Sequence, residues 1–359
     1  MRYELIDRLR RCRNRHELPP AYAAGYAFVG AGRHARQNLY PIVDYLHLPL
    51  CYVCCATPAS ARAVQAWRPG VRAVCDLGEV LADPAVRGVF VAAPARVQAA
   101  LARRILESGR ALFVEKPPCC DGAELACLLA AERAGGAPLA VAGLQRRCAP
   151  DVRLLARRIG RKRAACYQLT YRTGPYPEGD ALTELFLHPL DLAVHLFGPA
   201  RVEGFQCVGR APRDGQTLHL LLRHGEVCGN VTLSTAGAWN AAEDELRVDT
   251  AEGCYTLHPG RGLTLRRWPA RLFGLPAEKL RREAGTALRL WEVQPGLPEL
   301  CQNALYVNGF YEEVRRFAEV VEGRAADHPA ALAHLTDTYA LLDAVRRRWT
   351  GDGSSAAAH

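Results

Sequence analysis

The chain has 359 residues, 49% of them hydrophobic, and a formal net charge of +9. This size favours two domains with hydrophobic cores, and no apolar run of about eighteen residues predicts a membrane span. The charged N-terminus lacks the apolar core of a secretory signal, so we expect a cytoplasmic protein. The positive charge has no helix-turn-helix or zinc-finger spacing with it, which argues against nucleic-acid binding.

The first half of the chain alternates apolar segments with helical patterns. We expect an N-terminal helical extension over residues 1–23 and a dinucleotide-binding domain over 24–145. The alternation predicts an α/β domain with a doubly wound parallel sheet, the Rossmann arrangement. Strands are expected at 25–29, 50–55, 71–75, 86–92, 110–114 and 138–142, with helices near 34–46, 59–67, 78–83, 95–108 and 122–134.

Residues 146–349 predict a second domain, because closely spaced strands replace the alternation. Such strands favour an α+β domain with an open, mainly antiparallel sheet. We expect 259–300 to be an irregular excursion and 350–359 a disordered tail. Strands are expected near 164–172, 201–209, 216–223, 226–235, 245–250 and 253–258, and helices near 151–159, 183–197, 308–322 and 329–348.

A glycine-rich turn follows the first expected strand, with the sequence Gly30-Ala31-Gly32-Arg33-His34-Ala35. Gly30 allows the tight turn, Gly32 lets the backbone approach a pyrophosphate, and Ala35 permits close packing of helix on strand. The free N–H groups of the helix that starts here can bind phosphates. The turn therefore predicts a dinucleotide site.

The end of the second expected strand bears on the choice of cofactor. An acid at this place would hold the ribose 2′-hydroxyl of NAD, but residues 55–62 contain none. Thr57, Ser60 and Arg62 can hold a 2′-phosphate instead. This favours NADP modestly and leaves NAD open.

Lys116 stands out in a chain that has 46 basic residues and uses Arg for nearly all of them. It follows four apolar residues, 111–114, and Glu115, and two prolines come after it. In open parallel sheets, ligands bind beyond the carboxyl ends of the strands. A lysine there can shift its pKa as an arginine cannot. The alternative is that the Glu-Lys pair is the solvated start of a loop.

A second polar group has helical spacing. Glu184, His188, Asp191 and His195 fall at i, i+4, i+7 and i+11, so one helix would place them on one face. Because Pro189 disfavours a helix interior, we expect the helix to begin at His188, with Glu184 in the turn before it. His188 between two acids suits proton transfer. For His195 a solvent-facing role is favoured.

Together these motifs resemble the Gfo/Idh/MocA family, named after glucose–fructose oxidoreductase and inositol dehydrogenase. The resemblance covers residues 24–348. It rests on the Gly30–Ala35 turn, on Ala93-Pro94, on Glu115-Lys116-Pro117, and on the segment from Glu184 to Asp191. It implies a Rossmann domain and a second domain whose open sheet often forms dimer interfaces. We therefore expect a homodimer or homotetramer through that sheet.

The resemblance also implies roles for single residues. Lys116 matches a lysine that contacts the substrate and helps to set proton affinities, and His188 matches an acid/base histidine. Glu184 stands where the family usually has Asp, and Asp191 matches a further acid of the same motif. Gln98 lies where members often carry His. These two departures leave the identity of the substrate open.

The expected reaction is hydride transfer between NAD(P) and a secondary alcohol or ketone of a sugar, polyol or sugar derivative. His188 would take the hydroxyl proton, Lys116 would donate to the oxygen, and Glu184 or Asp191 would orient His188. Expected further contacts are Ala93, Pro94 and Glu115 with the cofactor and Gln145, Arg146, Arg172 and Tyr176 with the substrate.

Three other functions remain open from the sequence. They are an NAD-dependent glycosidase, a non-catalytic dinucleotide sensor, and reduction of a non-sugar acceptor as in biliverdin reductase. No metal is expected. Cys51 and Cys54 have a metal-like spacing, but on a strand residues three apart face opposite sides.

Overall fold

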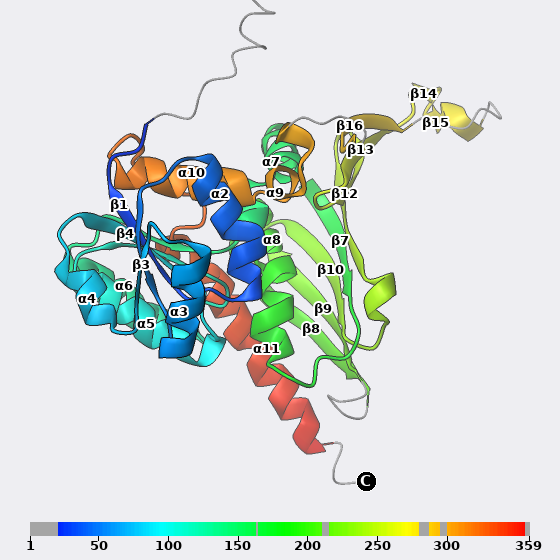
Figure 1. Cartoon of the computed structure of the whole chain (residues 1–359). Helices are drawn as coiled ribbons and strands as arrows, with labels where there is room; N and C mark the ends of the chain where they lie inside the picture. Colours follow the sequence, from blue (N-terminus) through cyan, green and yellow to red (C-terminus); the bar gives the residue numbers. More distant parts are fainter. Residues whose placement is uncertain (1–20, 163, 210–214, 280–286, 295–299, 356–359) are drawn as a thin grey trace, which may run out of the picture.

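The computed structural model describes residues 21–162, 164–209, 215–279, 287–294 and 300–355. Residues 1–20 of the expected N-terminal extension lie outside these ranges. The described chain forms two sheet-based domains that lie side by side, with helices between them (Figure 1). None of the helices is long and apolar enough to cross a membrane, within the part of the chain that was described.

The first domain is the expected doubly wound parallel sheet. Its strand order is β3-β2-β1-β4-β5-β6, and every neighbouring pair is parallel. The central strands read as continuous apolar runs because both faces of such a sheet are covered. The strands are β1 (Gly25–Val29), β2 (Leu50–Cys54), β3 (Arg72–Val74), β4 (Val86–Val91), β5 (Ala111–Val114) and β6 (Ala140–Ala142). The helices are α2 (Tyr40–Tyr45), α3 (Pro58–Trp67), α4 (Leu77–Ala82), α5 (Ala95–Glu107) and α6 (Gly122–Gly135), with a π-helical segment, η1 (Ala35–Leu39), before α2.

The second domain has the expected open sheet, with the order β16-β13-β12-β11-β7-β10-β9-β8. Its described pairs are antiparallel except β7 with β10. The strands are β7 (Ala164–Arg172), β8 (Arg201–Val208), β9 (Thr217–His224), β10 (Val227–Ser234), β11 (Glu243–Thr250), β12 (Gly253–His258), β13 (Gly262–Arg267) and β16 (Leu288–Glu292).

Part of the expected excursion over 259–300 is regular structure, which corrects that prediction. β13 and β16 extend the main sheet, and β14 (Arg271–Leu272) pairs with β15 (Leu275–Pro276) in a small hairpin. In β13, buried Leu263 and Leu265 alternate with Gly262 and Thr264, and two exposed arginines end the strand. One buried face is enough to hold a strand in an antiparallel sheet.

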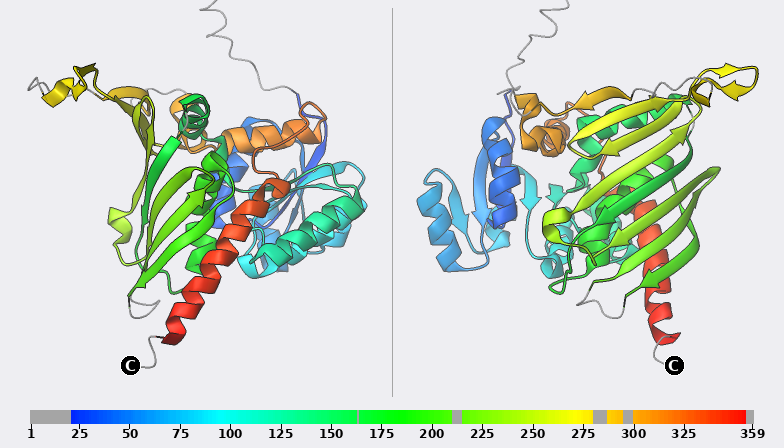
Figure 2. Two further views of the ribbon diagram at one scale, coloured as in Figure 1. Left: turned by 180° about the vertical axis from the view of Figure 1, so that it is seen from behind. Right: turned by 90° about the vertical axis from the view of Figure 1, so that its right-hand side faces the viewer.

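Helices cover only one face of the large sheet. α8 (Leu187–Phe197) and α11 (Thr336–Ser355) lie between the two domains, and Tyr167 of β7 stacks on Phe197 with 4.4 Å between ring centroids. α7 (Pro150–Lys162) covers the same face beside β12 and β13. The opposite face is open along the described strands (Figure 2). α11 continues to Ser355, past the expected start of a disordered tail at 350.

The C-terminal part of the chain returns to the first domain, although the expected boundary assigned it to the second. Phe317, on α10 (Phe310–Val321), packs against Phe90 and Phe113 with ring centroids 5.1 Å and 5.8 Å away. Ala331 forms an isolated antiparallel bridge with Val141 of β6. Two short helices, α9 (Ala304–Val307) and η8 (Leu332–Leu335), flank this region.

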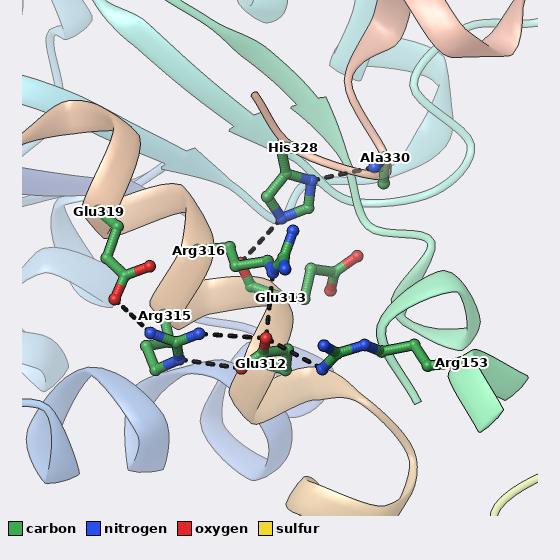
Figure 3. A network of polar contacts seen from close by, with 8 residues as sticks. All are labelled: Arg153, Glu312, Glu313, Arg315, Arg316, Glu319, His328 and Ala330. Carbon is green, nitrogen blue, oxygen red and sulfur yellow. Dashed lines mark hydrogen bonds and ion pairs between the residues drawn. The ribbon is translucent and has the colours of Figure 1, made fainter. Parts of the chain in front are cut away.

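Polar contacts of α10 tie both domains together (Figure 3). Glu312 accepts a hydrogen bond from Arg153 of α7 at 3.1 Å. His328 Nε2 lies 3.0 Å from the carbonyl of Glu313, and the Ala330 N–H donates to His328 Nδ1 at 3.0 Å. These bonds fix the segment that supports β6 and the turn after it, where candidate site residues follow.

Candidate active site

The glycine-rich turn has the geometry that a dinucleotide needs. Gly30 has φ +101°, and a Cβ there would meet the Ala92 carbonyl oxygen at 2.3 Å, so only glycine fits. A Cβ on Gly32 would meet nothing within 4 Å, so the backbone is open to a ligand there. Arg36 N–H donates to the Gly32 carbonyl at 3.1 Å, which starts the helix directly after the turn.

A cavity of about 460 Å³ lies against this turn, lined by Ala31, Arg33, Arg36 and Gln37. Two exposed guanidinium groups beside free helical N–H groups suit the phosphates of a dinucleotide. At the end of β2, Thr57 caps α3 by accepting from the Ser60 N–H at 3.2 Å. Arg62 is exposed on the same helix. The turn and cavity therefore fit NAD(P), but no contact here separates NADP from NAD.

Glu115 joins the two motifs of the first domain. Its carboxylate is bound on one side by His34 Nε2 at 2.9 Å and on the other by the Lys116 N–H at 3.2 Å. The hydrogen bond to the Glu115 carboxylate raises the pKa of His34. Ala93 and Pro94 follow the neighbouring strand β4 at the same sheet edge. Glu115 thus links the glycine-rich turn to the backbone of Lys116.

Gln98 holds the turn that carries Lys116. It is buried, and its side-chain amide donates to the Glu115 carbonyl at 3.0 Å and to the Pro117 carbonyl at 2.8 Å. The peptide bond between Lys116 and Pro117 is cis. The side-chain amide of Gln98 therefore holds this turn, at the position where the family resemblance implies a histidine.

Lys116 reaches across to the second domain. Its Nζ donates to the carbonyl of Glu184 at 2.7 Å. Glu184 lies in a π-helical segment, η3 (Leu182–Phe186), which runs directly into α8. In π geometry the partner of this carbonyl would be the N–H of residue 189, and Pro189 has none. The proline therefore leaves a helical carbonyl available to Lys116.

This geometry corrects the expected helix start. The helix begins at Leu182, before His188, and Pro189 is accommodated by the change from π to α geometry. The shift matters because a π-helix turns less per residue than an α-helix. The segment from Glu184 to His188 therefore departs from the ideal α-helix that the spacing assumed.

Burial lowers the pKa of Lys116, and the positive charge of Arg146 lowers it further. The negative charges of Glu115 and Glu184 act in the opposite direction. Burial also lowers the pKa of His188 well below its usual range, helped by the positive charges of Arg146, Lys116 and His34. His188 is neutral as a result and can accept a proton. Its Nδ1 is buried and has no hydrogen-bond partner within the described residues.

Neither acid of the motif is seen to orient His188, in contrast to the expected mechanism. The Glu184 carboxylate accepts from the Tyr176 hydroxyl at 2.8 Å and from the Asp180 N–H at 3.1 Å. Asp191 is buried in a paired interaction with Arg147, whose Nε and Nη2 donate to its two oxygens at 2.9 Å and 2.5 Å. Asp191 therefore anchors α8 to the turn after β6.

Arg146 approaches the same centre from the first domain. Its Nη2 pairs with Asp244 of β11 at 2.7 Å, and its guanidinium lies over the ring of Tyr171 at 5.6 Å. Gln145 precedes it in a short 3₁₀ helix, η2 (Gln145–Cys148), and is partly buried. Arg172 is exposed and 3.7 Å from Glu243. Of the expected substrate residues, Arg146 and Tyr176 thus lie among the catalytic candidates, whereas Arg172 does not contact them.

The sequence did not predict how these groups are paired. Arg147 and Tyr171 are next to the expected substrate residues Arg146 and Arg172, so a local signal marked them. Asp244 carries no motif, and its contact with Arg146 joins residues far apart in the chain.

Comparisons with known proteins point to a family of oxidoreductases. Residues 24–142 match the profile of the oxidoreductase family with an NAD-binding Rossmann fold, Gfo/Idh/MocA. The first domain is therefore similar to the NAD-binding domain of this family. The chain is 30% identical over 245 residues to a protein of Amycolatopsis mediterranei described as a UDP-kanosamine synthase oxidoreductase subunit. That match covers 63% of this chain and 61% of the relative, so the chain spans less than two thirds of the relative's length.

Two solved structures are similar to this chain in fold. A dehydrogenase from Chromobacterium violaceum is 18% identical, with a TM-score of 0.78 over 94% of this chain and 98% of its own. A 3-ketoreductase from Actinomadura kijaniata, in complex with TDP-benzene and NADP, is 18% identical, with a TM-score of 0.68 over 90% of this chain and 96% of its own. At this identity the likeness establishes the fold alone.

Proposed function

We propose that this protein is an NAD(P)-dependent oxidoreductase acting on a secondary alcohol or ketone of a nucleotide-linked sugar. One observation carries the proposal: Lys116 Nζ donates a hydrogen bond to the carbonyl of Glu184, in the helical segment before His188. Lys116 follows a strand at the same sheet edge as the glycine-rich turn. The relative named for a UDP-linked sugar and the structure with a TDP ligand support the substrate class.

The residues present fit the cofactor. The Gly30–Ala35 turn and the arginine-lined cavity would hold the pyrophosphate, and Thr57, Ser60 and Arg62 the adenosine side. Ala93, Pro94 and Glu115 lie where the nicotinamide half would pass. When bound, the nicotinamide supplies or accepts the hydride. NADP is favoured by the lack of an acid after β2 and by the nearby arginines.

Two side chains of the protein would handle the proton. His188 is neutral and takes the proton of the substrate hydroxyl, at Nε2 because Nδ1 is buried. Lys116 uses one N–H on the Glu184 carbonyl and has others to donate to the substrate oxygen, where negative charge develops. In the reverse direction the same groups return the proton. Tyr176 holds the Glu184 side chain and so keeps this turn in place.

The test measures hydride transfer with NADP, NAD and their reduced forms on UDP-linked and TDP-linked sugars. We expect His188→Ala and Lys116→Ala each to lower kcat by about 10²-fold or more, the usual contribution of general acid–base groups, with cofactor affinity within about twofold. His195→Ala serves as the control, because His195 lies on the same helix and was not expected to act.

Near-normal turnover by His188→Ala would overturn the assignment. Tightly retained cofactor without net turnover, together with release of the nucleotide from the sugar, would favour the glycosidase function instead. The proposed homo-oligomer through the open sheet remains a prediction that sedimentation can test.

A further inference from the structure

A second cavity opens on the inner face of the large sheet, next to the catalytic candidates. Its volume is about 430 Å³, within the usual range for small-molecule sites. It lies between the ends of β7 and β11 and the turn after β12. Its lining includes Arg146, Tyr171, Thr173, Asp244, Arg261 and Asn308.

Arg146 is shared by this cavity and the catalytic centre. Arg146 lines the cavity, and the next residue, Arg147, binds Asp191 on α8, the helix that carries His188. The positive charge of Arg146 also lowers the pKa of Lys116 and of His188. Arg146 Nη2 is bound by Asp244, but Nη1 is buried without a hydrogen-bond partner among the described residues. A buried guanidinium N–H that is left unpaired is costly, and phosphate oxygens match its geometry.

The order of these groups along the site identifies a ligand. A substrate that places its reacting carbon at Lys116 and His188 and extends into the cavity must pass Arg146 on the way. In a nucleotide-linked sugar, the diphosphate is the part between the reacting ring and the nucleoside. In an oligosaccharide, the group next to the reacting ring would be an uncharged glycosidic oxygen, which is a weaker partner for a buried guanidinium than a phosphate is.

We propose that this cavity is the subsite for the nucleoside diphosphate of the substrate, with Arg146 as the contact to the diphosphate. The inference rests on the proposed function and extends it. Arg261, exposed at the rim, supplies a second cation, and Asp244, Thr173 and Asn308 offer polar groups to the ribose and base. The Tyr171 ring and the Arg146 side chain already pack together, so the phosphate contact is held in place before binding.

The test is calorimetric titration of the full chain with UDP and with TDP. We expect Arg146→Met to weaken binding by about tenfold or more, since a hydrogen bond to a charged group contributes about that much. Arg261→Gln, at the exposed rim, should weaken it about threefold. The matched control is Arg247→Gln, because Arg247 is exposed on β11, an odd number of residues from Asp244 and so on the open face. It should leave binding unchanged.

Failure of this inference is separable from failure of the proposed function. Absence of UDP and TDP binding to the wild-type chain, or equal binding by the wild type, Arg146→Met and Arg261→Gln, would overturn the subsite. Circular dichroism checks that each variant is folded, and the exposed Arg261 keeps the test valid if Arg146→Met unfolds. Binding with the expected losses but without hydride transfer to any linked sugar would uphold the subsite and overturn the enzyme assignment.

Discussion

Two neighbouring arginines, Arg146 and Arg147, are each paired with an aspartate from the second domain, yet they differ in how completely they are bound. Arg147 and Asp191 have side chains only 3% and 2% exposed, and each Arg147 nitrogen has a partner, with Nη1 donating to the Pro329 carbonyl at 2.9 Å. Arg146 and Asp244 are 16% and 28% exposed, and Arg146 Nη1 has none among the described residues.

The contrast separates a structural pair from a ligand-binding one. Thr338 also donates to Asp191 at 3.0 Å, so the Arg147 pair belongs to a closed network that joins the turn after β6 to α8 and α11. The Arg146–Asp244 pair faces a cavity, and Arg146 Nη1 has no hydrogen-bond partner among the described residues. Arg146 and Arg147 are at adjacent positions, and they differ in how completely their N–H groups are hydrogen-bonded.

The largest expected effect comes from breaking the closed pair. Arg147→Met should lower the free energy of unfolding by about 3–5 kcal/mol, because it leaves the Asp191 carboxylate buried without a cation. Urea denaturation measures this. The double variant Arg147→Met with Asp191→Leu should lose less than the two single losses combined, since neither charge is then left alone. A single-variant loss below about 1 kcal/mol would show that the pair does not hold the domains together.

The sequence predicted the scaffold well and the site in part, for a physical reason. The strands of the first sheet are short apolar runs between helical patterns, and the glycine-rich turn needs conformations that few residues adopt. Such signals are local. β13 was missed because it has only two buried leucines, Leu263 and Leu265, in a segment rich in glycine, proline and arginine.

The missed contacts depend on tertiary structure. Arg147 meets Asp191, 44 residues away, and nothing in the sequence distinguishes it from Arg146. The expected face from Glu184 to Asp191 assumed 3.6 residues per turn, whereas Glu184 lies in a π-helical segment. Lys116 and His188 could be predicted because each lies in a short local motif that the family resemblance includes.

Glu313 is a buried acid that, unlike Asp191 and Asp244, has no ion pair among the described residues. It is fully buried on α10, close to Glu115 and Asp191. Burial raises the pKa of Glu313 well above its usual range, and the charge of Glu115 raises it further, so the folded state holds the acid neutral. A raised acid pKa contributes stability below the unfolded value of 4.5, and this stability is lost as the pH rises above it.

Glu313→Gln keeps the shape and removes the ionisation. Relative to the wild type, we expect the unfolding free energy of the variant to rise between pH 5 and pH 7, by at most about 1.4 kcal/mol per pH unit, the linkage of one proton. Chemical denaturation at several pH values measures the difference. A gap that stays constant with pH would mean that Glu313 is ionised in the folded protein.

The smallest expected effect on stability is at the open pair. Asp244→Asn removes a charge from a partly exposed ion pair but keeps an oxygen that can accept from Arg146, so the free energy of unfolding should change by less than about 1 kcal/mol. Burial raises the pKa of Asp244, and the charge of Arg146 opposes the rise. Urea denaturation beside the Arg147→Met variant makes the comparison direct. A loss of unfolding free energy as large as that of Arg147→Met would show that the Arg146–Asp244 pair is a structural contact. It would argue against a role of Arg146 in binding a ligand.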